Sequence, residues 1–279
     1  MNDSRPEMSH TPIAQPSSPW DEWPKWDSNQ EFCTKRFQFI GSVNQFDKKT
    51  QGDKIAILKH RQFIEIYKKL LSEQPLNILE LGYFQGGMPL FISDMHLPDL
   101  ANNSKPLHIV GIDYYEPTQE LKATIESNKL ADTIKLYGGI LQDDVKAIKT
   151  VVESEFGQQS LDLVIDDCSH QYQETKLCFE SFFSHLKPDG KYVIEDWGWQ
   201  HWPGEPWQTS NSPFHGKPSM SNLILELVMA MGSRPDIIAR IDVVSEFCTV
   251  ITRGPSLAHG ERVILSEITK MAGRTYVPM

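Results

Sequence analysis

Cysteine is scarce in this chain, and long apolar runs are absent. The 279 residues include four cysteines, which are widely spaced and form no CxxC pair, so neither a zinc knuckle nor a disulfide framework is indicated. The sequence contains no run of about 18 apolar residues, the length that a membrane-spanning helix needs. The N-terminal MNDSRPEMSH lacks the apolar stretch of a signal peptide. We therefore expect a cytoplasmic protein without a membrane partner.

Positive charge is also in short supply. The chain has 27 Lys and Arg against 37 Asp and Glu, a net charge of −10, and no block of basic residues gathers into a patch. A nucleic-acid-binding surface needs such a patch to neutralise phosphates. Nucleic acid is thus not an expected partner.

The first part of the chain lacks apolar periodicity and is rich in Pro, Ser, Asp and Glu. We assign residues 1–50 to an N-terminal arm, partly disordered or docked. Trp20, Trp23 and Trp26 are costly to leave in water, so the arm could pack on its own domain or on a second subunit. Whether the chain forms a homo-oligomer through this arm stays open.

Residues 51–279 show the rhythm of one α/β domain. Short apolar strands are predicted in PLNILELG (75–82), LHIVGID (107–113), TIKLYGG (133–139), LDLVIDD (161–167) and GKYVIED (190–196). Helical spacing of apolar residues separates them, for example at 145–152 and 179–186. Strands that are apolar on both faces and alternate with helices predict a mostly parallel sheet covered on both sides.

The regular pattern ends after residue 196. The segment 197–219 is rich in Trp, Pro and Gly, which predicts a long functional loop: either an aromatic lid over a sugar ring or packing at a subunit interface. An amphipathic helix follows near 220–231. DVVSEFCTVITRG (242–254) and ERVILSEI (261–268) are expected to supply the last strand material.

The first predicted strand leads into a glycine-rich turn, ILELGYFQGGMPLFI (78–92). Gly82, Gly86 and Gly87 allow the backbone to turn sharply and approach a ligand. The spacing G-x-x-x-G-G and the acid Glu80 before it disfavour a pyrophosphate and therefore NAD. Asp113 ends the next strand, where a carboxylate can accept hydrogen bonds from a ribose diol.

These features together resemble the class I S-adenosylmethionine-dependent methyltransferases, and the HLKPDGKYVIED segment extends the likeness. The resemblance implies a Rossmann-like seven-stranded sheet, mostly parallel, with helices on both faces. It implies that Glu80 and the three glycines surround the methionine part of S-adenosylmethionine and that Asp113 holds its ribose. Gln142 and Asp143 are the candidates on the adenine side.

Acidic residues also follow the fourth and fifth predicted strands. Asp166, Asp167 and His170 follow one, and Glu195 and Asp196 follow the other. Carboxyl ends of parallel strands share one rim of the sheet, where four carboxylates repel each other unless a cation neutralises them. Oxygen ligands suit Mg²⁺ or another hard divalent cation.

The spacing of IDDCSH and IED resembles the metal-dependent macrolide sugar O-methyltransferases of mycinamicin and tylosin tailoring, and the rhamnosyl O-methyltransferase and cephalosporin hydroxylase group. The resemblance implies that Asp167, Glu195 and Asp196 bind the metal. It implies that His170 is the general base, with Asp167 the second catalytic residue. Asp166 is expected to support the cofactor site rather than to bind the metal. The alternative for His170 is that it only caps the helix after it.

The predicted function is metal-dependent methyl transfer from S-adenosylmethionine to a hydroxyl of a glycosylated or diol-bearing natural product. Two alternatives stay open. One is a methyltransferase for a catechol-like or carboxylate acceptor, and the other is a non-catalytic family member that acts as a partner protein.

Overall fold

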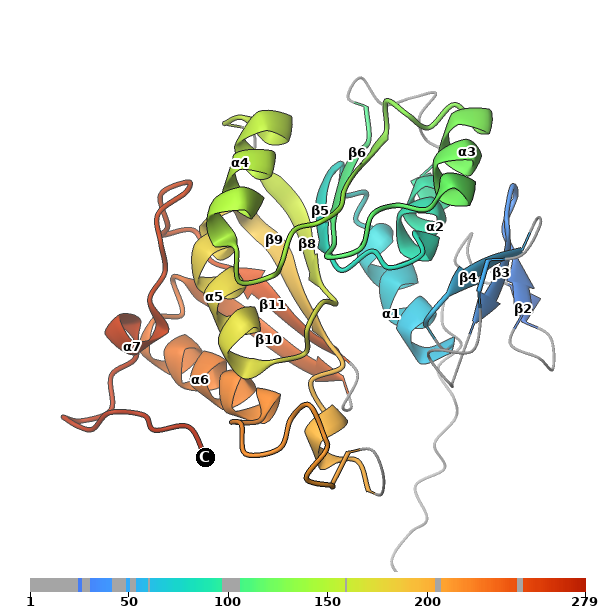
Figure 1. Cartoon of the computed structure of the whole chain (residues 1–279). Helices are drawn as coiled ribbons and strands as arrows, with labels where there is room; N and C mark the ends of the chain where they lie inside the picture. The colour runs from blue at the N-terminus through green and yellow to red at the C-terminus, as the bar shows by residue number, and fades with distance from the viewer. Residues whose placement is uncertain are drawn as a thin grey trace, which may run out of the picture.

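The computed structural model describes residues 25–26, 31–41, 49–50, 54–59, 61–96, 106–158, 160–203, 207–244 and 248–279. Of the tryptophans in the predicted arm, Trp20 and Trp23 lie outside these residues. Figure 1 shows a central sheet between two groups of helices, with a small N-terminal sheet beside it. None of the helices in this part of the chain is both long enough and apolar enough to cross a membrane.

The main sheet has seven strands. They are β5 (Asn77–Leu81), β6 (His108–Ile112), β7 (Ile134–Tyr137), β8 (Leu161–Asp166), β9 (Leu186–Glu195), β10 (Ile238–Val244) and β11 (Cys248–Arg253). The helices are α1 (Arg61–Leu71), α2 (Gly87–His96), α3 (Gln119–Ser127), α4 (Val145–Phe156), α5 (Tyr172–Phe182), α6 (Met220–Ser233) and α7 (Leu265–Ile268). Two short 3₁₀ helices are η1 (Phe183–His185) and η2 (Trp199–His201).

The strand order of this sheet is β10-β11-β9-β8-β5-β6-β7. The five strands from β9 to β7 run parallel to one another, while β11 is antiparallel to β9 and β10 is antiparallel to β11. The chain leaves β5 toward β6 and β7, then returns to place β8 on the other side of β5. In open α/β sheets, ligands bind at the carboxyl ends of the strands beside such a reversal. The pairing of β8 with β9 confirms that the predicted fourth and fifth strands are neighbours.

The core consists of one apolar cluster on each face of the sheet. Successive side chains of a strand point to opposite faces, so Ile78 joins the cluster under α1 and α2 while Leu79 joins the cluster under α4, α5 and α6. Figure 1 shows these two helix groups on opposite sides of the sheet. The predicted mostly parallel sheet with helices on both faces is thus confirmed.

A second, four-stranded sheet is built from the N-terminal part of the chain, in the order β1-β2-β3-β4. Its strands are β1 (Lys25–Trp26), β2 (Glu31–Cys33), β3 (Gln38–Gly41) and β4 (Lys54–Ile57). Phe32 and Phe39 are buried, stack on each other with ring centroids 5.1 Å apart, and meet Phe91 of α2. This sheet therefore shares the core cluster under α1 and α2.

One strand prediction is wrong. Residues 261–268 form no strand; they contain only the four-residue helix α7. Val263 and Leu265 are nonetheless buried against α5, where Val263 N donates to the carbonyl of Glu180 and Leu265 N to its carboxylate. The apolar alternation of this segment reflects packing on a helix, since β10 and β11 already complete that side of the sheet.

Candidate active site at the carboxyl ends of the strands

The ends of β5, β6 and β8 are joined by backbone hydrogen bonds around Gly82. Gly82 N donates to the carbonyl of Ile112 at 2.8 Å, and Asp167 N donates to the carbonyl of Leu81 at 2.9 Å. Gly82 has a φ of +91°, and a Cβ there would lie 2.0 Å from the carbonyl oxygen of Asp167. Only glycine fits this approach, so the turn after β5 and the turn after β8 form one structural unit.

Glu80 lies in β5 on the face covered by α1 and α2 and is fully buried. Its Oε2 atom has no hydrogen-bond partner among the described residues. Burial raises the pKa of Glu80 well above its usual value, while the charge of Lys59 opposes the shift. A buried carboxylate oxygen without a partner is costly, which makes this atom a candidate to accept a proton or hydrogen bond from a ligand.

Glu80 and two of the predicted glycines border one pocket. Gly82 and Gly87 line it together with residues 56–59 and Asp167. Gly86 lies in the same turn with a φ of +76°, and its N–H donates to the carbonyl of Tyr83 at 2.7 Å. The structure thus brings the predicted methionine-binding residues together, and residues 56–59 form a wall that sequence reasoning did not predict.

Asp113, at the end of β6, closes the turn after β5 from the other side. Its carboxylate accepts from the backbone N–H of Phe84 at 2.7 Å and of Tyr115 at 2.8 Å. Burial raises the pKa of Asp113, and these backbone donors oppose the shift. Each carboxylate oxygen accepts more than one hydrogen bond, so Asp113 can still receive a hydroxyl donor.

Asp166 and Gln142 are joined to each other. Asp166 accepts from Gln142 Nε2 at 2.7 Å and from the Tyr192 hydroxyl at 2.9 Å, and Gln142 Oε1 accepts from Ser169 N at 3.0 Å. Burial raises the pKa of Asp166 to about 8. This network points away from the metal candidates because successive residues at the end of a strand, here Asp166 and Asp167, face opposite sides of the sheet. It fixes the turn that carries Asp167 and His170.

Asp167, His170 and Asp196 form the tightest group of potential metal ligands among the described residues. One ligand atom from each lies within 4.8 Å of the others, and His170 Nε2 is 3.8 Å from Asp167 Oδ1. Burial, followed by the charges of Asp167 and Glu195, raises the pKa of Asp196 well above its usual value. Two carboxylates and an imidazole at this spacing can hold a divalent cation.

Two members of this group have unusual backbone conformations. His170 has a φ of +54° and Asp196 a φ of +51°, in a region of backbone conformation that residues other than glycine rarely adopt. Such conformations cost about 1–3 kcal/mol each and persist where the surroundings hold them, frequently at functional sites. The helix after His170 begins at Tyr172 with Gln171 as its N-cap and has no side-chain cap hydrogen bond. In this structure, His170 is therefore not the cap of α5.

The imidazole of His170 is held from several sides. Its ring lies 4.2 Å from the Trp199 ring, centroid to centroid, and its Nε2 lies 3.8 Å from Asp167 Oδ1. Burial lowers the pKa of His170 below its usual value, Asp167 opposes the shift and Lys59 adds to it. A neutral imidazole keeps one ring nitrogen able to accept a proton.

Glu195 is next to this group but faces different partners. Its Oε2 accepts from the ammonium of Lys59 at 2.7 Å, and its Oε1 accepts from the hydroxyl of Tyr67 on α1. Lys59 also donates to Asp167 Oδ2. Burial and the charge of Asp167 raise the pKa of Glu195 to about 7, while Lys59 opposes the shift. Of the three predicted metal ligands, Glu195 is thus the one outside the compact group.

Lys59 and Tyr67 are the functional candidates that sequence reasoning missed. Both are separated from Glu195 by more than 120 residues in the sequence, so no local spacing indicates the contacts. The only signal is that Lys59 directly follows the apolar run of β4. Tyr67 looked like an ordinary member of the apolar face of α1.

The described part of the predicted 197–219 loop lies next to His170. Trp199, Trp202 and Trp207 have ring centroids 5.1–6.3 Å apart, and Phe214 stacks on Trp207. Trp199 and Phe214 are buried, and Trp199 is the member that contacts the ring of His170. The loop therefore presents an aromatic surface at the edge of the candidate site.

Comparison with known proteins shows related sequences and folds. Residues 79–197 match the family described as "Methyltransferase domain". The chain is 46% identical over 43 residues to demethylmacrocin O-methyltransferase of Streptomyces fradiae, covering 15% of this chain and 11% of that protein. It is 29% identical over 137 residues to L-olivosyl-oleandolide 3-O-methyltransferase of Streptomyces antibioticus, covering 49% of this chain and 32% of that protein.

The fold is similar to that of a solved structure, the MycE methyltransferase from the mycinamycin biosynthetic pathway, in complex with Mg, S-adenosylhomocysteine (SAH) and mycinamycin VI. The TM-score is 0.50 at 22% identity, and the alignment covers 71% of this chain and 51% of MycE. The aligned parts thus span about half or less of each relative.

Proposed function

We propose that this chain transfers a methyl group from S-adenosylmethionine to a hydroxyl of a sugar or diol-bearing natural product, because residues 79–197 match a methyltransferase domain and the fold is similar to that of MycE. The observation that carries the proposal is that two polar sites meet near Gly82. Glu80, with its unpartnered oxygen, lines one pocket with Gly82 and Asp167, and Asp167 also belongs to the group with His170 and Asp196. The names of two related O-methyltransferases support the acceptor class.

The cofactor site of this proposal lies along the turn after β5. Glu80 accepts a hydrogen bond from the amino group of the methionine part of S-adenosylmethionine. The pocket for this part is lined by backbone and needs glycine at positions 82, 86 and 87. Asp113 accepts from the ribose. Gln142 and Asp166 are proposed to shape the adenine side of the pocket by fixing the turn between 166 and 170. The bound sulfonium supplies the methyl group for an in-line displacement.

The proposed cation is Mg²⁺ or another hard divalent ion, held by Asp167 and Asp196, with Glu195 as the third carboxylate. The donor chemistry fits, because carboxylate oxygens are preferred ligands of such ions and the Asp167–His170–Asp196 group is compact. When bound, the ion supplies positive charge that orients the acceptor diol and lowers the pKa of its hydroxyl. MycE is described in complex with Mg, which supports the choice of ion.

His170 is proposed as the general base. A base must be neutral to accept a proton, and burial lowers the pKa of His170, so the imidazole stays neutral through physiological pH. Its contact with the Trp199 ring restrains the orientation of the imidazole. The aromatic loop provides a face on which a sugar ring can stack.

The test compares His170→Ala with His201→Ala. His201 lies in the same region but is exposed and contacts Ser221, so it serves as the matched control. Both variants should bind SAH like wild type in calorimetry. With methyl-labelled S-adenosylmethionine and glycosylated macrolides, His170→Ala should lose transfer by at least about a hundredfold, the usual contribution of a positioned base, and His201→Ala should not. Full activity of His170→Ala would remove the base assignment.

A further inference from the structure

A buried lysine lies among the acids of the candidate site. Lys59 follows β4, outside the matched methyltransferase domain, and is 3% exposed. Its ammonium donates to Asp167 and, at 2.7 Å, to Glu195. The side chains of Lys59 and Glu195 are 4% and 0% exposed, so this ion pair is shielded from water. Lys59 therefore places an ammonium between two acids of the candidate site.

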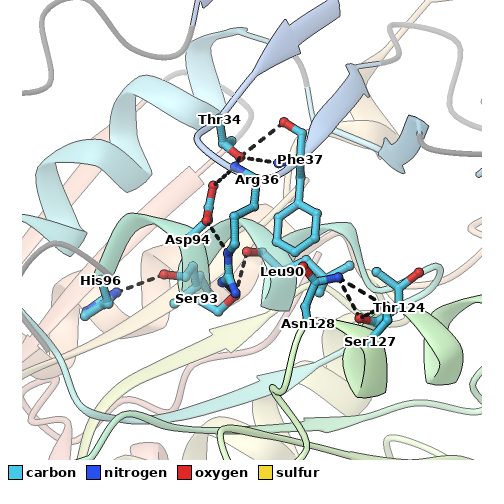
Figure 2. Close-up of polar contacts among 11 residues, drawn as sticks. Thr34, Arg36, Phe37, Leu90, Ser93, Asp94, His96, Thr124, Ser127 and Asn128 are labelled. Atoms are coloured by element: carbon cyan, nitrogen blue, oxygen red, sulfur yellow. Dashed lines mark hydrogen bonds and ion pairs between the residues drawn. The ribbon is translucent and has the colours of Figure 1, made fainter.

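The N-terminal sheet holds Lys59 in this place. Figure 2 shows the side chain of Arg36, between β2 and β3, reaching Asp94 on α2, and the Nε–Oδ1 distance is 2.8 Å. Next to Lys59, β4 passes so close to the start of α2 that a Cβ on Gly87 would lie 2.4 Å from the carbonyl oxygen of Ala56. The backbone leading to Lys59 is thus fixed against α2.

The two oxygens of Asp167 face different partners. Oδ2 accepts from Lys59, while Oδ1 lies toward His170, within the group that can hold a cation. Glu195 likewise binds Lys59 with one oxygen. A divalent cation that uses both carboxylates therefore has to draw them away from an ammonium that already neutralises them.

We propose that Lys59 is a positioning residue that competes with the divalent cation for Asp167 and Glu195 and so sets the cation concentration at which the site fills. The ammonium keeps both acids ordered when no cation is bound and weakens cation binding by like-charge repulsion. This inference rests on the cation of the proposed function. It goes beyond that function because it assigns control of the cation site to a residue delivered by the N-terminal sheet.

The test measures Mn²⁺ affinity by electron paramagnetic resonance and Mg²⁺ affinity by calorimetry on the full chain, without acceptor. Lys59→Met should bind both ions at least about tenfold more tightly, because two like charges a few ångströms apart repel by several kcal/mol in a protein. Lys59→Arg keeps the charge and should bind like wild type. Unchanged or weaker binding by Lys59→Met would overturn the proposal.

Lys176 provides the matched control. It is paired with Glu226, whose carboxylate also accepts from a tyrosine hydroxyl, that of Tyr172, as Glu195 does from Tyr67. Lys176→Met removes an equivalent cation away from the site and should leave Mn²⁺ affinity unchanged. A gain in affinity equal to that of Lys59→Met would show a general charge effect and would contradict the proposal.

A second measurement uses the unaltered chain, in case Lys59→Met does not fold. The buried ammonium of Lys59 should give a slowly exchanging ¹⁵N resonance, assigned by its loss in Lys59→Arg. Saturating Mg²⁺ should shift or broaden this resonance, and an unchanged resonance during Mg²⁺ binding would overturn the proposal. If the ion affinities change as expected but no methyl transfer is found, the proposed function fails and the role of Lys59 stands.

Discussion

Replacing Gly82 by alanine tests whether the turns after β5 and β8 are one unit. The Cβ would lie 2.0 Å from the carbonyl oxygen of Asp167 and 2.6 Å from its carbonyl carbon, so backbone has to move. The matched control is Gly157→Ala at the end of α4, where φ is also positive, at +58°, but no atom lies within 4 Å of a Cβ. The comparison separates the steric overlap at Gly82 from the cost of a positive φ, which both variants carry.

Two contributions set the expected loss in the free energy of unfolding. A positive φ in a sparsely populated region costs an alanine about 1–3 kcal/mol, and both variants carry a penalty of this kind, Gly157 at φ +58° and ψ −121°. Overpacking adds about 1–3 kcal/mol at Gly82 alone. Urea unfolding should therefore show Gly82→Ala destabilised by about 2–6 kcal/mol and Gly157→Ala by about 1–3 kcal/mol. SAH affinity should fall only in Gly82→Ala, because the displaced backbone lines the cofactor pocket. Equal destabilisation, with SAH affinity intact, would refute the close approach.

Three further predictions concern the docking of the N-terminal sheet, a buried histidine and the aromatic loop. Arg36→Met leaves the fully buried carboxylate of Asp94 without its guanidinium and should lower the free energy of unfolding by about 3–5 kcal/mol in urea titrations. His185 is buried, and burial lowers its pKa to about 4. The unfolded state therefore binds the extra proton below about pH 6.5, so stability should fall from pH 6.5 to 4, and less steeply in His185→Gln. Trp199→Ala should raise the KM for a glycoside acceptor about tenfold in initial-rate assays by removing an aromatic face, with SAH affinity unchanged.

Each of these has a result that would contradict it. Arg240→Met breaks the exposed pair with Asp242, so equal losses at Arg36 and Arg240 would mean that burial of the partner does not matter. Parallel pH curves for wild type and His185→Gln would reject the lowered pKa of that histidine. If Trp199→Ala weakens SAH and acceptor binding alike, the loop supports the whole site instead of contacting the acceptor.

The acids at the strand ends were predictable from sequence for a physical reason. Parallel strands bring their carboxyl ends to one rim, so Asp113, Asp167 and Glu195 could be placed there from strand positions alone. The different roles of Asp166 and Asp167 follow because successive side chains at the end of β8 point to opposite faces of the sheet. Asp166 accepts a hydrogen bond from Tyr192, whereas Asp167 accepts one from Lys59.

Other features were not accessible from sequence because they depend on long-range packing. The strands at 31–41 are only three or four residues long, too short to give a clear periodic pattern. Their burial comes from contact with α2, more than 50 residues away in the sequence. Lys59 could not be predicted as a site residue because its partners lie 108 and 136 residues along the chain.

The proposed reaction of this chain is cation-dependent methyl transfer to a sugar hydroxyl. The most direct measurement follows transfer of a labelled methyl group from S-adenosylmethionine to a glycosylated macrolide by the full chain, first stripped of metal with a chelator and then supplied with Mg²⁺. We expect transfer to disappear on stripping and to return with Mg²⁺, with SAH still bound in both states. Transfer that continues undiminished after thorough removal of metal would contradict it.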